Sequence, residues 1–259
     1  MDTLKPGTAL FDGPTGPVLR DATGELFGVA LPPESLDRVR AALSGPGPRP
    51  DELAAFARAG HLGARPRLDR PTVAVVAGGP AASALITALT GALDLAGAAP
   101  VRLPADLDAL LAADPAAVCA WHDGPAPAAW ADLDALADRG VAWQRISREG
   151  RHVLFEPIGT GHRDVRLRRL AAAGSGHGHL AAYWAGDGLR GDDAPDAAER
   201  ALIAALAVKD LVRHLTGATP APGGLTPAGV PPHRRLRVLD LDSGEIADHP
   251  VLPVPASAP

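Results

Sequence analysis

The stretch TVAVVAGGPAAS, residues 72–83, decides the fold. Its first half is a run of apolar, mostly β-branched residues, which is typical of a buried strand, and a glycine pair then turns the chain into a helix expected over Ala81–Leu95. Short strands and helices alternate after it: a strand at Val101–Leu103, a helix at Asp106–Ala113, a strand at Ala117–Trp121 and a helix at Ala128–Asp138. Strands and helices that alternate at these lengths predict a parallel sheet with helices on both faces.

The remaining C-terminal residues belong to the same domain, which we place at residues 71–259. Two hairpins are expected there. The first joins Trp143–Ser147 to His152–Glu156, and the second joins Arg235–Leu241 to Glu245–Leu252. Between the hairpins, apolar residues at helical spacing predict helices at Asp164–Ala173 and Pro195–Leu215. The fold class of this part is therefore α/β, with a Rossmann-like sheet.

The N-terminal residues 1–63 have a different pattern, dense in turn residues. They contain three short strand-like stretches, Thr8–Phe11, Pro17–Arg20 and Glu25–Leu31. Two helical patterns follow, one that begins at Pro33 and one that begins at Asp51. Three strands followed by helices predict a small winged-helix-like module, and the charged, proline-containing residues 64–70 predict a linker.

The turn at Gly78 and Gly79 has the position of a phosphate-binding loop but not its residues. A G-x-G-x-x-G fingerprint spaces its glycines so that backbone amides can reach the phosphates, whereas here the glycines are adjacent and Pro80 removes an amide. Between residues 72 and 130 the only basic side chains are Arg102 and His122, which is little positive charge for a triphosphate. We therefore expect an ordinary turn in a degenerate nucleotide-binding sheet, and no cofactor.

The other residues that carry chemistry favour neither a metal site nor a catalytic site. His177 and His179 stand in a glycine-rich stretch where we expect a flexible surface loop, because a zinc site needs a third ligand. The acidic runs Asp132–Asp138 and Asp187–Asp196 have the pattern of charged loops and helix faces, and no spacing singles out a catalytic pair. No G-x-S-x-G motif is present, and the single cysteine, Cys119, lies in an apolar strand where we expect it to be buried and inert.

Composition narrows the classes of partner. A formal net charge of −5 argues against a general nucleic-acid binder. A winged helix on DNA would also need a basic recognition helix, and Asp51–Ala59 has only Arg58 as a base. The N-terminus shows no secretory signal, and the longest apolar run, Thr72–Leu93, is interrupted by glycine and proline, so no membrane span is predicted. We expect a cytoplasmic protein.

The strand Glu25–Leu31 is the candidate binding element of the N-terminal module. If it lies at the edge of a sheet, its free amides and carbonyls can pair with an added peptide strand, and the following helices supply an apolar groove. The other interpretation is an ordinary edge strand packed on its own core. The residues alone leave these two interpretations open.

Taken in order, these features resemble the ThiF-like (ubiquitin-activating-enzyme-like) partner proteins of azole-forming, thiopeptide-type ribosomal peptide natural product pathways. The resemblance is carried by the module Thr8–Leu62, the strand and turn Thr72–Gly79, the strand pair Ala142–Ile158, the stretch His179–Trp184 and the ending Val238–Val254. The full glycine motif, the ribose carboxylate and the basic set that handles ATP in adenylating members are missing or displaced here, and the chain departs from the family pattern in two further respects. The module has room for two helices where three are usual, and the Cys-x-x-Cys zinc pairs of many relatives are absent.

The resemblance implies a non-catalytic scaffold that acts in antibiotic biosynthesis. Such a protein binds the leader of a ribosomal precursor peptide and presents the core to a YcaO-type cyclodehydratase, which forms azolines from Cys, Ser and Thr. The peptide-binding residues that it implies are the strand Leu26, Phe27, Gly28, Val29, Ala30 and Leu31 and the groove residues Leu53, Phe56 and Ala57. A homodimer is compatible with it, and it assigns no metal, nucleic-acid or membrane partner. The alternative is an ATP-using adenylating enzyme of the ThiF class.

Overall fold

The computed structural model describes residues 3–45, 48–64, 67–79, 82–186, 194–218, 229–230 and 232–252. These residues form two compact units, the first within Met1–Pro66 and the second within Arg67–Ala218 and Gly229–Pro259. Each unit has a hydrophobic core of its own. Two residues of the predicted linker, Arg65 and Pro66, lie outside the described residues.

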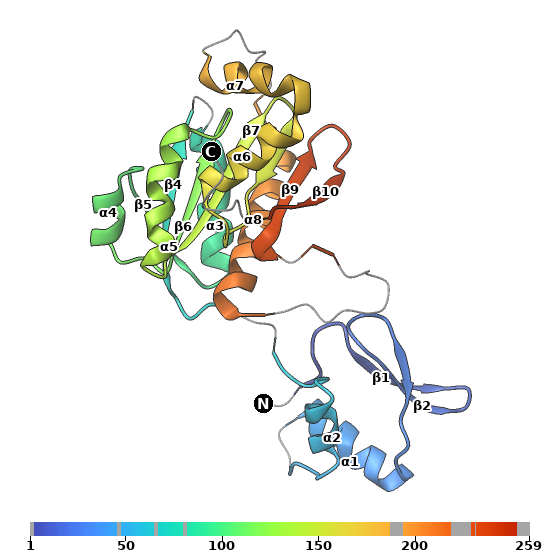
Figure 1. The fold of residues 1–259 in the computed structure, drawn as a ribbon. Helices are drawn as coiled ribbons and strands as arrows, with labels where there is room; N and C mark the ends of the chain where they lie inside the picture. Colours follow the sequence, from blue (N-terminus) through green and yellow to red (C-terminus); the bar gives the residue numbers. More distant parts are fainter. Residues whose placement is uncertain are drawn as a thin grey trace. The chain divides into compact units, whose positions relative to one another are not determined.

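The first unit is a three-stranded antiparallel sheet with two helices. Strands β1 (Ala9–Gly13), β2 (Gly16–Arg20) and β3 (Leu26–Gly28) pair in the order β1-β2-β3, and helices α1 (Pro33–Ser44) and α2 (Leu53–Arg58) follow (Figure 1). This confirms the predicted three strands and two helices. The third strand is shorter than the predicted seven residues, because the Leu31 amide bonds back to the Val29 carbonyl and Pro32 then leads into α1.

One face of this small sheet packs on the two helices. Leu10 lies opposite Leu19 and Leu19 lies opposite Phe27, so these three side chains share a face. The fully buried part of the core consists of Leu19, Val39, Leu53 and Phe56. Such a small core makes each of its large side chains important for the stability of the unit.

The second unit is built on a seven-stranded sheet in the order β10-β9-β8-β7-β6-β4-β5. The neighbours among β4 to β7 pair in parallel, as the alternation of strands and helices predicts, and β8, β9 and β10 extend the sheet with antiparallel pairs. Both predicted hairpins lie in the antiparallel half. The strands are β4 (Thr72–Gly78), β5 (Ala99–Arg102), β6 (Ala117–His122), β7 (Ala142–Glu149), β8 (His152–Phe155), β9 (Arg235–Asp240) and β10 (Ile246–Pro250).

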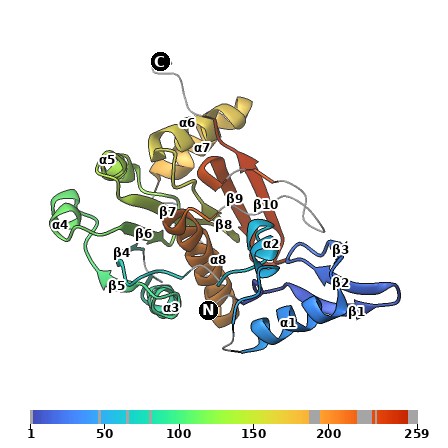
Figure 2. The same ribbon diagram turned by 90° about the horizontal axis from the view of Figure 1, so that it is seen from below.

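Helices cover both faces of the large sheet (Figure 2). Strand residues such as Val75 and Ile146 pack with α3 and α8 on one face, and Val76 and Ala120 pack with α4 and the segment before β7 on the other. The helices are α3 (Ala82–Leu95), α4 (Leu107–Ala112), the 3-10 helix η1 (Ala128–Asp134), α5 (Ala135–Asp138), α6 (His162–Ala172), the 3-10 helix η2 (Gly174–Gly176), α7 (His177–Ala185), α8 (Ala197–Thr216) and the 3-10 helix η3 (Pro232–Arg234).

Two segments of the second unit differ in their type of structure from the sequence-based expectation. The helix predicted over Ala128–Asp138 is a 3-10 helix for its first seven residues and an α-helix for its last four. The stretch around His177 and His179 is a helix, α7, and not a flexible loop. The physical reason is an anchor near its end: the Trp184 ring stacks against two arginines of α6, at 4.3 and 5.0 Å, and its indole N–H donates to Glu149.

Candidate functional site

Hydrogen-bond direction shows which backbone groups of β3 are free. The Val29 amide donates to the Pro17 carbonyl, and the Glu25 carbonyl accepts from the residue after β2, so the odd-numbered residues of this strand face β2. In an antiparallel pair, the residues between them direct N–H and C=O away from the partner strand. Among the described residues no strand pairs with this side of β3, so Leu26 and Gly28 present their N–H and C=O groups to any strand that is added there.

A proline blocks one edge of the seven-stranded sheet, at β10. The Glu245 carbonyl and the Val251 amide bond toward β9, so the residues in register between them, Ile246, Asp248 and Pro250, face outward. Proline has no N–H to donate, and an outward-facing proline protects an edge strand from pairing with another chain. β10 is thus a poor template for an added strand.

The opposite edge strand of the same sheet, β5, also has an outward-facing proline. The amides of Ala99 and Leu103 donate to carbonyls on the β4 side, so Pro100 in the middle of the strand faces outward. The proline ring again removes an outward donor. Neither edge of the large sheet is therefore well suited to bind an extended peptide.

The small sheet has two edges, and different helices flank them. Asp12 of β1 is held by Arg40 of α1, with Nη2 and Oδ1 2.5 Å apart. On the β3 side the ring of Phe27 lies 5.8 Å from that of His61, three residues after the end of α2. We therefore take β3 with α2 beside it as the candidate binding edge.

Five of the predicted peptide-binding residues are exposed. Leu26 is 63% exposed and Phe27 is 41% exposed, which is unusual for large apolar side chains in a small unit. Gly28, Ala30 and Ala57 are exposed as well. Since three of the four exposed residues of α2 are alanines, a peptide backbone can approach this part of the helix closely.

The other four predicted residues belong to the core of the first unit. Val29 and Leu31 are half buried against it, and Leu53 and Phe56 are only 4% and 7% exposed. Phe56 therefore does not line an open groove. Changing Phe56 is therefore expected to disrupt the fold of this unit, because truncating a buried phenylalanine costs about 3–5 kcal/mol.

The turn after β4 is filled by the end of β6. Gly79 has a φ of +92°, and a Cβ there would lie 2.7 Å from the Asp123 carbonyl oxygen, while a Cβ on Gly78 would lie 2.9 Å from the His122 ring. Both glycines are thus needed for packing between neighbouring strand ends. Asp123 itself is almost fully buried and pairs with Arg148, with Nε and Oδ1 2.7 Å apart. Pro80, which the sequence pattern singles out in this turn, lies outside the described residues.

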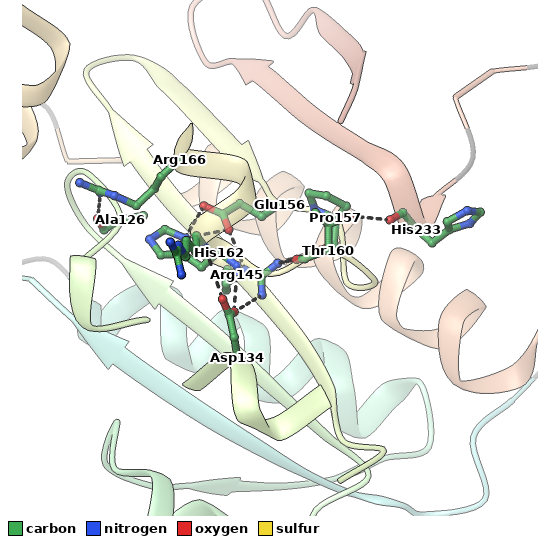
Figure 3. Close-up of polar contacts among 10 residues, drawn as sticks. Ala126, Asp134, Arg145, Glu156, Pro157, Thr160, His162, Arg166 and His233 are labelled. Carbon is green, nitrogen blue, oxygen red and sulfur yellow. Dashed lines mark hydrogen bonds and ion pairs between the residues drawn. The ribbon is translucent and has the colours of Figure 1, made fainter. Parts of the chain in front are cut away.

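A buried polar network that the sequence patterns do not predict joins β7, β8 and α6 (Figure 3). Arg145 of β7 is 1% exposed, and its guanidinium donates in three directions. Nε donates to Glu156 at 2.7 Å, Nη1 donates to Asp134 at 3.3 Å, and Nη2 donates to the carbonyls of Pro157 and Thr160. A buried arginine with this many charged and carbonyl partners holds the segments that contain them firmly together.

His162, the first residue of α6, completes this network. Its Nδ1 lies 2.9 Å from Glu156 Oε2, and its amide donates to the Asp134 carboxylate at 2.8 Å, so Asp134 caps α6 from another element. Burial alone raises the pKa of Glu156, but the charge of Arg145 and the hydrogen bond from His162 outweigh it and hold the pKa below its ordinary value. Because these charges are directed at one another, the network positions α6 on the sheet.

The remaining candidates provide neither a metal site nor a nucleophile. His177 and His179 are two residues apart on α7, about 200° around the helix, so they point to different sides. The described ranges hold no group of three or more His, Cys, Asp or Glu placed to bind a metal. Burial raises the pKa of the Cys119 thiol to about 12, so it is not a thiolate at neutral pH. None of the helices in the described ranges is both long and apolar enough to cross a bilayer.

No protein-family model matches the sequence, and no curated protein is similar to it. Solved structures are similar in fold. A heterocyclase in complex with substrate and cofactor has a TM-score of 0.60 and 14% identity over 97% of this chain and 38% of that chain. E. coli MccB with ATP has a TM-score of 0.56 and 8% identity over 99% of this chain and 98% of that chain. The E. coli microcin synthetase McbBCD complex with pro-MccB17 bound has a TM-score of 0.50 and 12% identity over 99% of this chain and 98% of that chain.

These likenesses concern the fold of the molecule. The chain spans about two fifths of the heterocyclase chain that it matches and nearly the whole of the MccB and McbBCD chains. The resemblance to ThiF-like proteins of ribosomal peptide pathways is confirmed at the level of the fold, as is the predicted α/β architecture with a small N-terminal module.

Proposed function

We propose that this protein binds the leader of a ribosomal precursor peptide as an added strand on β3 and presents the peptide's core to a YcaO-type cyclodehydratase. The observation that carries the proposal is the open edge of β3 beside α2, in a chain whose large sheet has a proline on each edge. Main-chain bonds to Leu26 and Gly28 supply affinity, and contacts with Phe27 and Ala57 supply selectivity.

The fold neighbours support a role in azole formation on ribosomal peptides. One is a heterocyclase with its substrate, and another is a microcin synthetase complex with pro-MccB17 bound. This chain matches 38% of the heterocyclase, so in our proposal the cyclisation chemistry resides in a separate enzyme of a thiopeptide-type pathway that makes an antibiotic. The chain described here supplies peptide recognition and no catalytic group of its own.

Binding of the leader is tested by fluorescence anisotropy. The probe is a labelled leader of the precursor peptide encoded beside this gene, and we expect saturable binding with a Kd at or below about 1 μM. Phe27→Asp places a charge in the apolar contact and is expected to weaken binding by about tenfold or more.

Phe11→Asp is the matched control for this experiment. Phe11 lies on β1 at the other edge of the same sheet and is 41% exposed, the same as Phe27. Its change is expected to leave the Kd unaltered. An equal loss in both variants, or no saturable binding by the folded protein, contradicts the proposed site.

The second candidate function is that of an ATP-using adenylating enzyme of the ThiF class. It is favoured by the similarity in fold, over nearly the whole chain, to MccB with ATP. The turn after β4 speaks against it, because its glycines are adjacent where a phosphate-binding loop spaces them, and both pack closely on the end of β6.

Isothermal titration with ATP and magnesium separates the two candidates. The scaffold proposal predicts no heat of binding, since the turn after β4 packs on β6 and Asp123 is paired with Arg148. A saturable signal with a Kd tighter than about 1 mM would favour the adenylating enzyme. The same titration with the labelled leader present checks whether the peptide creates a nucleotide site.

A further inference from the structure

The outward side of the layer formed by α3 and α8 carries almost no charge. The two helices contact each other and cover the same face of the seven-stranded sheet (Figure 2). A helix at the surface of a globular protein normally directs charged side chains away from the core. α3 has a single charged residue, Asp94, among its 14 residues, and Leu95 at its end is 80% exposed. A helix of this composition is typical of a buried position, so we expect a partner to cover it.

The exposed residues of each helix lie together on the side away from the sheet. With 3.6 residues per turn, the buried Ile203, Ala207 and Leu211 share one side of α8, and an exposed stripe follows the opposite side. The same division holds in α3. We call the two exposed stripes together the α3–α8 face. Its small and apolar residues include Ala84, Gly91, Leu95, Ala201, Leu202 and Ala205.

The exposed residues of the α3–α8 face include one anion and one cation, Asp94 and Lys209. Within the described ranges neither forms an ion pair with another residue of the chain. Arg213, one turn beyond Lys209, is half buried in the last turn of α8, where a cation is favourable beside the helix C-terminus. The exposed part of the face is thus neutral in a chain whose formal net charge is −5. Two copies can bring these faces together without bringing together net charge of one sign.

We propose that the α3–α8 face binds the same face of a second copy of this chain, related to the first by a two-fold axis. In a two-fold interface every contact between two residues occurs twice, so Asp94 of one copy faces the partner's Lys209 and the reverse pair forms as well. Alanine and glycine on both helices let the helix axes approach to about 8 Å. Burial of Leu95 and Leu202 supplies the apolar part of the affinity. This face belongs to the second unit, so the proposal does not depend on the peptide site at β3.

The size of the face fits a dimer of modest affinity. α3 has 14 residues and α8 has 20, so they are about 21 and 30 Å long. Two helices of about 10 Å diameter, side by side, offer about 500 Å² per copy, and two copies bury about 1,000 Å². That area is close to the lower limit for a specific interface between proteins. We therefore expect a dimer Kd of about 1–100 μM.

Sedimentation equilibrium of the whole protein at about 1–200 μM tests the dimer, because a Kd in this range populates both species. The monomer has a mass of 26.4 kDa, and we expect the average mass to rise toward twice this value with concentration. Leu95→Glu combined with Leu202→Glu should weaken dimerisation by about hundredfold or more, since each substitution acts twice in the dimer. Ile246→Glu, at a residue of β10 that is 46% exposed, is the matched control and should leave the Kd unaltered. A folded protein that stays monomeric overturns the proposal in favour of a different partner for this face, and a dimer that keeps its Kd in the leucine variant overturns the face.

Exchanging the two charges tests the two-fold pairing itself. Asp94→Lys places lysine against lysine at two points of the dimer, and we expect a Kd about tenfold weaker. Lys209→Asp places aspartate against aspartate and should have a similar effect. Both changes in one chain restore opposite charges, so the double variant should return to within about threefold of the Kd of the natural protein. Circular dichroism checks the fold of each variant. A folded double variant as weak as the single variants overturns the pairing of Asp94 with Lys209 and with it the proposed two-fold arrangement.

Discussion

Replacing Gly28 with proline is expected to lower the affinity for the leader peptide by about thirtyfold or more. The Gly28 N–H faces away from β2, so proline removes a donor that an added strand uses, while the bonds between β2 and β3 are kept. A peptide carbonyl left without its donor costs about 1–3 kcal/mol, and the proline ring also hinders the approach of the added strand. Anisotropy with the labelled leader measures the loss, and circular dichroism checks the fold.

Gly28→Ala is the matched control for the proline variant. A Cβ at Gly28 meets no atom within 4 Å, and alanine keeps the N–H, so we expect a Kd within about twofold of that of the natural protein. This pair of variants isolates the backbone donor from the side chain. Equal affinity of the two folded variants would show that the peptide does not pair with β3.

Local patterns are sufficient to predict most of the large sheet. The β-branched run that becomes β4 is buried on both faces, and such strands read as continuous apolar segments. Both hairpins are marked by turn residues, and Gly150 and Gly244 adopt φ values of +62° and +73°, where glycine is favoured. Pattern and turn chemistry agree in these segments, so the prediction holds.

Patterns fail where tertiary contacts decide the conformation. The glycine-rich stretch that opens α7 has a weak helix propensity, and the helix is held by the stacking of Trp184 on α6, which no local pattern contains. The same holds for Phe56: a helix face predicted to line a groove is in fact the face that packs on the small sheet. Which face of a short helix is buried depends on the position of its partner strands.

Part of the buried network could have been found from the sequence. A turn at Glu149 and Gly150 pairs Ser147 with His152 and so puts Arg145 opposite Leu154, on the same face as Glu156. In the structure the register differs by two residues: Glu149 pairs with His152, and Arg145 lies directly opposite Glu156. Arg145 also lies two residues from Trp143 and so shares its buried face. A charge on a core-facing strand position, opposite a charge of the other sign, is a signal for a buried ion pair. The roles of Asp134 and His162 are set by the packing of α6 and have no such signal.

Replacing Arg145 with methionine is expected to destabilise the second unit by about 3–5 kcal/mol, which lowers its Tm by roughly 6–20 °C. Methionine fills much of the volume but leaves Glu156 buried without its cation and the carbonyls of Pro157 and Thr160 without a donor. Thermal and urea unfolding followed by circular dichroism measure the loss. Adding Glu156→Gln to this variant removes the second charge, and the double variant should recover about 1–3 kcal/mol relative to Arg145→Met alone.

The pH dependence of the stability of Arg145→Met distinguishes an unpaired Glu156 carboxylate from lost packing as the cause of the destabilisation. In the natural protein the pKa of Glu156 is held below its ordinary value, so its contribution is present above about pH 4.5 and is lost as the pH falls further. Without Arg145, burial dominates and the pKa of Glu156 rises, although His162 and Asp134 still lie beside the network. The free-energy cost of the buried, unpaired Glu156 carboxylate is then largest at pH 7 and becomes smaller at lower pH, as the carboxyl takes up a proton. The deficit relative to the natural protein should therefore be larger at pH 7 than at pH 5 by about 1 kcal/mol or more. A deficit that is the same at both pH values would mean that packing, and not the unpaired carboxylate, determines the loss.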